Sequence, residues 1–429
     1  MIIRTNYSSL TSVLALGNLL VSPKEVPENM KAMYLCVENG RLVSAVSDGT
    51  VYCKYFLEGE YDLEGEDNPR MVVGVKELSF ALSKYSSLSR TQVKEIVLQT
   101  FKNGIILTVN EEAKQLKDPN MFTHSDMYDN LSTKYKLTSF TGIPRIFDEI
   151  SKVALNEKVA KEVDGKEFRK YLDYFYSPMT KPKKSPELIF NDELVYTIMG
   201  NVVGIAMPNT LPKDIFSSIN LRVENIKFLQ NVISTENTFK VDKVEESSKV
   251  ATAGDWVSIQ SVLTFQTDNI IIRMKCVYKG DAPGYSCFSK KMQNAVMVDK
   301  PYFLDTLKRL DGADSVYVNI KIDDNPSDSL RPNAQFIIQT NSLTYRIPVN
   351  QAHGSGEFKF SVTPSNLAIM VFSHLKQDMD GQSDQINDLI FCMENTEKDI
   401  THLSCCDKSN DWQTRYPRAQ YLQPVKLDF

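Results

Sequence analysis

The sequence predicts an α+β protein built from three repeats of one folding unit. Its 429 residues are too many for one hydrophobic core, and the usual domain size suggests about three domains. Amphipathic helix patterns recur roughly every 140 residues, and strand-like runs follow each of them. These observations predict domains over 1–142, 143–283 and 284–429, each with two helices packed on β-sheets.

One helix of each repeat has a clear apolar stripe. In the first repeat, Leu78, Ala81 and Leu82 stand at helical spacing. In the third, Thr363 can cap the helix and Pro364 suits its first turn. These helices are predicted over 75–88, 223–233 and 364–376.

A second helix is predicted to open each repeat, over 9–20, 145–163 and 301–310. The apolar stretch from Leu194 to Pro208 is broken by Gly200 and Asn201, and therefore predicts two buried strands joined by a tight turn. Other β-rich runs are predicted over 41–56, 95–100, 104–110, 256–265, 270–278, 315–322, 335–349, 357–362 and 387–393.

Composition indicates an ordinary soluble globular protein, because 42% of the residues are apolar and 24% are charged. The net charge of −5 argues against a uniformly basic surface, although local basic faces remain compatible with it. The seven cysteines match neither a disulfide framework nor a zinc motif. Neither a signal peptide nor a membrane-spanning segment is recognisable. We expect a cytoplasmic protein without membrane association.

Signatures of catalysis do not appear in the sequence. The four histidines form no metal-binding array, and no phosphate-binding Walker lysine or Gly-x-Ser-x-Gly motif occurs. We therefore expect a binding protein rather than an enzyme, with no metal and no cofactor.

Residues 418–428 resemble the closing strand of the bacterial β sliding clamps, which are DNA polymerase processivity factors. The Pro424-Val425-Lys426-Leu427 segment is similar to the family's final Pro-Met-Arg-Leu. Three further segments resemble family motifs in the same order along the chain. They are 168–173, similar to a Tyr-Tyr-Leu strand; 198–203 with Met207-Pro208, similar to a Thr-Asp-Gly-His-Arg-Leu turn; and 280–285, similar to Gly-Arg-Phe-Pro-Asp-Tyr.

The chain also departs from the family pattern. The histidine and arginine of the turn are replaced, and the chain has a long loop over 111–133, a basic insertion over 177–186 and two residues after Leu427. Such divergence resembles a bacteriophage member more than a housekeeping clamp.

The resemblance implies a homodimer that closes head to tail into a ring around duplex DNA. The ring would tether the replicative DNA polymerase without reading DNA sequence, and a clamp loader would open it. It implies a pocket for partner peptides between the second and third domains. Its lining would be Leu172, Gly200, Asn201, Val203, Pro283, Phe288, Pro424, Val425 and Leu427. The alternative is that these residues form an ordinary core at a domain junction.

A sliding ring needs cations that attract phosphates without selecting bases. Candidate DNA-facing residues are Lys24, Lys84, Arg90, Lys152, Arg169, Lys170, Lys227, Lys308, Arg309 and Lys376. Any one of them could instead lie on a solvated outer face.

Two other functions fit the same sequence. An open, monomeric processivity factor would hold DNA by charge alone, with a steep salt dependence. A structural or inhibitory protein with the clamp fold would bind replication proteins without encircling DNA.

Overall fold

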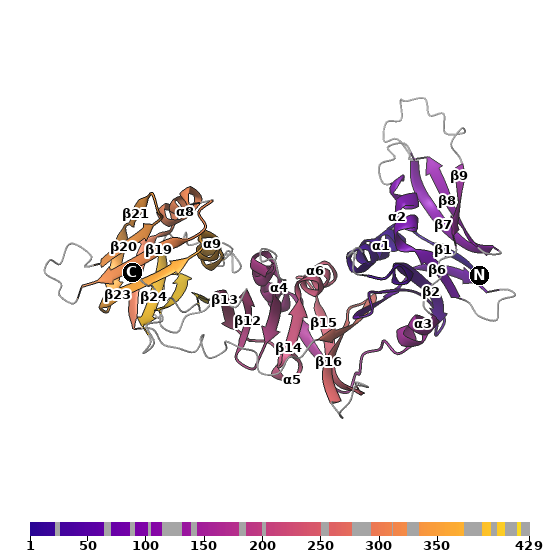
Figure 1. The fold of residues 1–429 in the computed structure, drawn as a ribbon. Coiled ribbons are helices and arrows are strands. Elements are labelled where there is room, and N and C mark those ends of the chain that lie inside the picture. The colour runs from indigo at the N-terminus through magenta and orange to yellow at the C-terminus, as the bar shows by residue number, and fades with distance from the viewer. Residues whose placement is uncertain are drawn as a thin grey trace. The chain divides into compact units, whose positions relative to one another are not determined.

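A computed structural model of the 429-residue chain defines the fold (Figure 1). The structure describes residues 1–21, 26–63, 70–85, 91–101, 104–113, 131–138, 144–179, 186–199, 203–249, 257–276, 293–310, 312–323, 334–372, 388–395, 401–407 and 418–421. The chain forms two compact units. Unit 1 comprises 1–165 and 228–276, and unit 2 comprises 166–227 and 277–429.

Unit 1 contains two antiparallel sheets. Sheet A has the spatial order β5 (Gly59–Asp62), β1 (Ile2–Thr5), β7 (Thr91–Phe101), β8 (Gly104–Ala113) and β9 (Leu131–Thr138). Sheet B has the order β10 (Lys161–Asp164), β15 (Thr238–Lys249), β16 (Val257–Gln266), β17 (Ile270–Cys276), β4 (Val51–Phe56), β3 (Arg41–Ser47), β2 (Ala32–Glu38) and β6 (Arg70–Gly74). Its helices are α1 (Tyr7–Val21), η1 (Glu28–Met30), α2 (Val75–Ser83) and α3 (Pro144–Ser151).

Unit 2 also contains two antiparallel sheets. Sheet C has the order β14 (Ile219–Arg222), β11 (Glu187–Phe190), β12 (Leu194–Met199), β13 (Val203–Pro208), β26 (Arg418–Tyr421), β25 (Thr401–Asp407), β24 (Asp388–Asn395), β18 (Asn294–Asp299) and β22 (Val349–His353). Sheet D has the order β21 (Thr344–Ile347), β20 (Ala334–Gln339), β19 (Val316–Ile322) and β23 (Gly356–Val362). Helices α4 (Gly165–Met179), α5 (Lys213–Phe216), α8 (Lys300–Arg309) and α9 (Pro364–Phe372) accompany them, and α6 (Val223–Val232) is divided between the units.

Helices cover both faces of sheet B, because successive side chains of a strand point to opposite faces. On one face, α1 approaches β3 closely: a Cβ placed on Gly17 would lie 3.3 Å from the Val46 side chain. On the other face, the α3 residues Ile146, Phe147 and Ile150 pack in one buried cluster with Val43 of β3. The two helices therefore lie on opposite sides of this sheet.

The core of unit 2 joins its two sheets through aromatic side chains. Phe303 of α8 lies 5.0 Å from Phe391 of β24 and 5.8 Å from Phe336 of β20, measured between ring centroids. Phe336 and Phe391 meet edge to face at 5.3 Å. All three side chains are almost fully buried, so they contribute a large share of the hydrophobic stabilisation of this unit.

The predicted α+β class is confirmed. Helices α1, α2, α6, α8 and α9 occupy the segments predicted from apolar periodicity, although α2 ends at Ser83, before the predicted end. The two strands predicted between Leu194 and Pro208 are β12 and β13, which pair directly. The predicted boundaries over 1–142, 143–283 and 284–429 stay a prediction. Residues 143–283 contribute to both compact units, because β15–β17 extend sheet B and β11–β14 extend sheet C.

The helix predicted over 145–163 is wrong beyond Ser151. Helix α3 ends in a tighter turn, in which the backbone N–H groups of Lys152 and Val153 donate to carbonyls three residues earlier. The ammonium of Lys54, a buried side chain of β4, donates to the carbonyls of Ile150 at 3.4 Å and Val153 at 3.5 Å. A cation at a helix C-terminus satisfies carbonyls that have no partner in the helix. Lys54 also forms an ion pair with Glu38, and the chain continues into β10.

The strand predicted for Phe168–Asp173 is also wrong, because this segment lies within α4. Phe168, Tyr171, Leu172 and Phe175 are buried at the spacing of one helix face. The Tyr171 ring lies 6.1 Å from the Phe190 ring, and its hydroxyl donates to the Pro208 carbonyl at 2.7 Å. Aromatic residues with high strand propensity thus follow the helical period here.

Cys36, Cys53, Cys276, Cys392 and Cys405 are buried, and none of these five forms a disulfide. Burial raises the pKa of the Cys53 and Cys276 thiols to about 12, which keeps them protonated and unreactive. Within the described ranges, no helix is both long and apolar enough to cross a membrane, and no group of three or more metal-binding side chains occurs.

We predict that Phe147→Ala destabilises the β2–β3 region of unit 1 by about 3 kcal/mol, because it removes a buried ring that packs edge to face on Tyr34 at 4.9 Å. Asp148→Ala, an exposed position on the same helix, should change stability by less than about 0.5 kcal/mol. Amide hydrogen exchange of β2 and β3 measures both effects. Equal protection in the two variants would show that α3 does not stabilise the sheet.

Candidate nucleic-acid interface

Helix α8 presents two of the predicted DNA-facing cations to solvent. The Asp299 side chain caps this helix by accepting from the Tyr302 backbone N–H at 2.7 Å. Phe303 and the rest of the buried face then turn Lys308 and Arg309 outward. These two cations lie in the last turn, where the helix dipole favours positive charge. An exposed ion pair with Asp305, at 2.6 Å, orients Arg309.

Helices α4 and α6 carry three more of the predicted residues. Arg169 and Lys170 are partly exposed on α4, and Lys227 is exposed on α6. Arg169 pairs with Asp173 one turn later at 3.1 Å, so part of its charge is neutralised locally. Helix α4 has three basic and two acidic residues, and α8 has three basic and one acidic. These helices are therefore locally more basic than the chain as a whole, whose net charge is −5.

Lys84 and Lys152 of unit 1 do not share a surface. Lys84 follows α2, which packs beside α1, whereas Lys152 follows α3 on the opposite face of sheet B. Lys152 also pairs with Glu149 at 3.2 Å. A single DNA duplex against α1 and α2 would meet Lys84 but not Lys152. The remaining predicted positions, Lys24, Arg90 and Lys376, lie outside the described residues.

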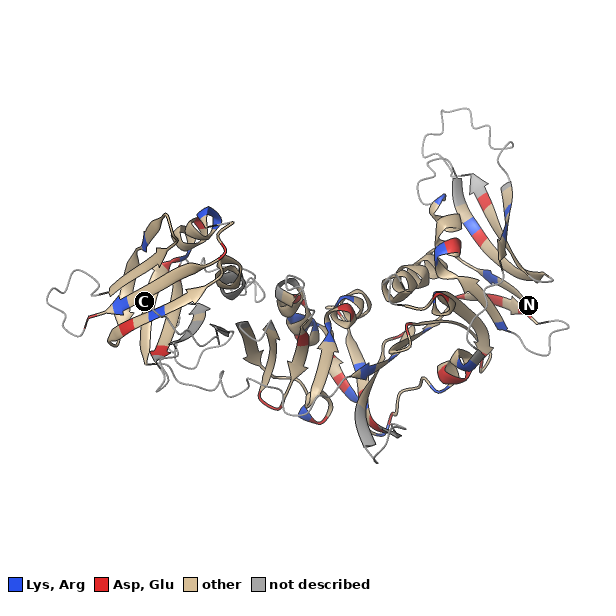
Figure 2. Ribbon diagram, in the orientation of Figure 1, with Lys and Arg blue, Asp and Glu red and all other residues tan. Residues whose placement is uncertain are grey.

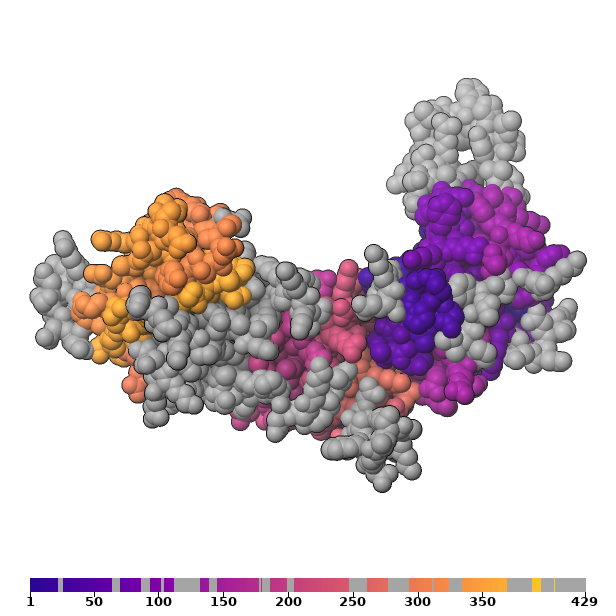
Figure 3. All heavy atoms as spheres, in the orientation of Figure 1, coloured from indigo at the N-terminus to yellow at the C-terminus, as the bar shows by residue number. Residues whose placement is uncertain are grey.

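Helix α1 has no charged residue along its length, as Figure 2 shows. Its exposed positions include Ser8, Ser12 and Ala15. The indigo residues near the N-terminus form part of the face seen in Figure 3. Such a surface can approach phosphates without repulsion and without fixing one register, because it has no carboxylate and no fixed pair of base-reading donors.

Two parts of the predicted peptide pocket are connected by the strand order of sheet C. β13 pairs with β26, with Val203 opposite Tyr421 in antiparallel register. Val203, the first residue of β13, and Tyr421, the last residue of β26, therefore lie at the same end of the sheet. Among the predicted lining residues, Leu172 is fully buried on α4 and Val203 begins β13. Gly200, Asn201, Pro283, Phe288, Pro424, Val425 and Leu427 lie outside the described residues.

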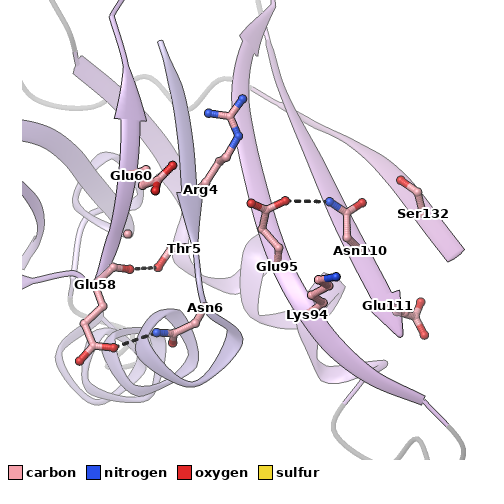
Figure 4. A pocket seen from close by; sticks show the side chains of 11 residues that line it. Arg4, Thr5, Asn6, Glu58, Glu60, Lys94, Glu95, Asn110, Glu111 and Ser132 are labelled. Atoms are coloured by element: carbon pink, nitrogen blue, oxygen red, sulfur yellow. Dashed lines mark hydrogen bonds between the residues drawn. The ribbon is translucent and has the colours of Figure 1, made fainter. Parts of the chain in front are cut away.

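A polar cavity of about 700 Å³, not predicted from the sequence, opens on sheet A of unit 1 (Figure 4). Hydrogen bonds order its walls: the Thr5 hydroxyl donates to the Glu58 carbonyl at 2.6 Å, and the Asn110 amide donates to the Glu95 carboxylate at 2.9 Å. Its charged lining is Arg4, Lys94, Glu58, Glu60, Glu95 and Glu111. The excess of carboxylates does not suit phosphate. The lining comes from separate strands, so no local motif reveals it.

Comparison by sequence gives no matching family model and no matching curated protein. Comparison by structure gives full-length matches. The DNA polymerase III beta subunit of Pseudomonas aeruginosa is 12% identical, with a TM-score of 0.62 and complete coverage of both chains. That of Thermotoga maritima is 12% identical, with a TM-score of 0.62 and 99% coverage of each chain. The DNA polymerase sliding clamp of Bacillus subtilis is 11% identical, with a TM-score of 0.60 and coverage of 100% of this chain and 99% of the other.

The chain has the fold of a bacterial β sliding clamp. The resemblance inferred from short segments is thereby confirmed for the fold over the whole chain. Within this clamp fold, the Tyr-Tyr-Leu-like segment was placed on the wrong element, since 168–173 is helical. Of the other segments, 198–199 ends β12 and 203–208 forms β13, which pairs with β12 and with β26 at 418–421. At 11–12% identity, the match establishes the architecture of the chain and assigns no role to individual residues.

We predict that Lys308→Ala weakens binding to duplex DNA equally for all sequences and reduces the slope of log affinity against log salt by about 1, because one phosphate contact is lost. Lys240→Ala provides the control: Lys240 is exposed on sheet B and pairs with Glu157 at 3.0 Å. Fluorescence anisotropy from low to moderate salt measures both variants. An unchanged slope for Lys308→Ala would exclude this residue from the DNA interface.

Proposed function

We propose that this protein is a DNA sliding clamp that encircles duplex DNA and tethers a replicative DNA polymerase. The observation that carries the proposal is the full-length likeness to bacterial polymerase III beta subunits, which covers both chains from end to end. The mechanism is topological. Encirclement, rather than tight contact, retains the DNA and leaves the ring able to slide.

The proposed ring is a homodimer closed head to tail by three-domain chains, with divisions near residues 142 and 283. Support comes from the sheet edges. In the described part of the chain, β9 pairs only with β8 at one edge of sheet A, and β21 pairs only with β20 at one edge of sheet D. An exposed strand edge is a template for another strand. Addition of a sheet A edge to a sheet D edge of the second chain gives a closed, symmetric dimer.

The proposed DNA contacts are phosphate contacts from helices. Lys84, Lys227, Lys308 and Arg309 are exposed, and Arg169 and Lys170 are partly so. Scattered cations of this kind bind any sequence. The net charge of −5 means that acidic residues dominate elsewhere on the chain. That distribution favours DNA on the basic helices and disfavours it on other surfaces.

The proposed partner site is an apolar groove for short extended peptides of the polymerase and of an ATP-driven clamp loader. Its support is the pairing of β13 with β26, which places Val203 and Tyr421 at one end of sheet C. Burial of each Leu or Phe anchor would contribute about 1.5–3 kcal/mol. Such modest affinity suits exchange of partners, and two sites per ring add avidity.

The proposal includes action in the cytoplasm of a bacterium or an infected host cell, no chemical catalysis, no cofactor and no membrane partner. A bacteriophage source would account for the sequence divergence. The competing proposal is a clamp-fold protein that binds replication proteins or DNA without encirclement. One fold can host several functions, so the ring and the competing proposal both need a test.

We predict that the protein has the mass of a dimer by light scattering. Once loaded, it should remain on nicked circular DNA in moderate salt and leave after linearisation, because an open end removes the topological barrier. Size exclusion of the protein with labelled DNA before and after cutting measures this. A monomer whose retention is the same on circles and linear molecules would support the open factor and contradict the ring.

We also predict that deletion of Leu427, Asp428 and Phe429 weakens binding of a labelled extended peptide ending in Leu-Phe by roughly tenfold or more, because one apolar wall of the groove is lost. The dimer mass should not change. Deletion of Asp428 and Phe429 alone is the matched control and should have a smaller effect. Unchanged peptide affinity in the longer deletion would contradict the pocket assignment.

A further inference from the structure

Phe80 is the most exposed large apolar side chain in the part of the chain that the structure describes, with 68% of its surface accessible. It lies on α2, whose buried residues include Leu78, Ala81 and Leu82. The core of unit 1 therefore does not require an aromatic ring at this position. A polar residue would serve the fold equally well, so the ring calls for another explanation.

Phe80 belongs to a small group of aromatic and basic side chains, here called the aromatic patch: Phe80, Lys84, Tyr85 and Tyr135. The Lys84 ammonium lies 5.0 Å from the Phe80 ring centroid and 5.2 Å from that of Tyr135. These distances allow cation–π attraction to both rings. The group is thus held together on the surface, rather than being a chance exposure of one residue.

The two tyrosines form a fixed base for the aromatic patch. Their rings meet edge to face at 6.3 Å, and their hydroxyls are 2.7 Å apart. Burial, together with the hydrogen bond to Tyr135, raises the pKa of Tyr85 to about 12.

The surroundings of the aromatic patch include two lysines of α2 or its C-cap, the uncharged α1, and the carboxylates of Glu77 and Glu111. Lys76 is exposed one turn before Phe80 on α2. The neighbouring α1 is uncharged and is tied to α2 by a hydrogen bond from the Asn18 amide to the Ser79 hydroxyl at 2.9 Å. The one carboxylate of α2, on Glu77, accepts from the Thr138 backbone N–H at 3.2 Å. A ring flanked by two ammonium groups suits a partner that offers both flat apolar faces and negative charge.

We propose that the aromatic patch binds unpaired nucleotides of single-stranded DNA, with a base stacked on Phe80 and phosphates contacted by Lys84 and Lys76. Single-strand binding surfaces combine aromatic rings with cations in this way. In a duplex the base faces are covered by their neighbours, so stacking on Phe80 requires an unpaired base. The inference rests on the proposed function only in placing DNA beside α1 and α2. A clamp at a primer end would then hold duplex and the adjoining single strand at different residues.

The test uses the full-length protein and fluorescence anisotropy with labelled dT20 and a blunt duplex of equal length. Phe80→Ala should lower affinity for dT20 by about tenfold and change duplex affinity by less than about twofold. Phe80→Trp should retain dT20 affinity, because it restores a stacking surface. Lys84→Ala should weaken both complexes and reduce their salt dependence. Leu343→Ala, a comparably exposed apolar residue of unit 2 at 52%, is the control and should alter neither.

Three outcomes would overturn the inference: no binding of dT20 by the unsubstituted protein, equal dT20 affinity for Phe80→Ala, or loss of the dimer mass in Phe80→Ala, which would assign the patch to a protein contact. Thermal unfolding of each variant checks that the fold is intact. Retention on circular DNA separates this result from the proposed function. If the protein is retained on circles and its Phe80→Ala variant binds dT20 normally, the protein is a clamp without this site. If Phe80→Ala selectively loses dT20 binding and the protein is not retained on circles, the site is supported and the ring is not.

Discussion

The antiparallel pairing of β13 with β26 is the contact on which the architecture of unit 2 depends. Backbone pairs from Val203 opposite Tyr421 to Ala206 opposite Arg418 join strands from distant parts of the sequence into one nine-stranded sheet. Without this pairing, β13 and β26 would each present an open edge. The same ladder places Val203 of the proposed peptide pocket opposite Tyr421 at one end of the sheet. One set of backbone hydrogen bonds therefore links the fold to the proposed partner site.

A second constraint comes from the helices, each of which must bury one face. On α8 the burial of Phe303 and Leu307 leaves Lys308 and Arg309 exposed. On α4 the burial of Phe168 leaves Arg169 partly exposed. On each helix, the apolar residues recur with the helical period and are buried on one face, which leaves the charged residues on the other face. Phosphate-binding cations can be supplied in this way without a dedicated loop or motif.

Unit 1 shows that proximity in sequence does not decide which surface a residue occupies. Helices α1 and α3 lie on opposite faces of sheet B, since Val46 and Val43 of one strand point in opposite directions. Lys54 holds α3 in place by binding the carbonyls at its C-terminal end. Lys152, which follows α3, and Lys84, which follows α2, therefore lie on opposite sides of sheet B, although both are basic residues close to helix ends. It also leaves the α1 and α2 side with hydroxyls, two lysines and the exposed Phe80.

The sequence by itself determined the α+β class and the segments of five helices, because apolar periodicity is local and is read directly from residues such as Leu78 and Leu82. It also determined the β12–β13 hairpin, through the Gly200-Asn201 break between two apolar runs. Phe168–Asp173 was predicted to be a strand from its resemblance to the family motif, and this prediction was wrong: its aromatic residues favour strands, but their spacing fits a helix. Only the tertiary structure decided that Lys152 and Lys84 lie apart, that β13 meets β26, and that Phe80 is exposed beside Lys84. These features depend on which face of each element is covered and by what, and that is set by contacts between residues far apart in the chain.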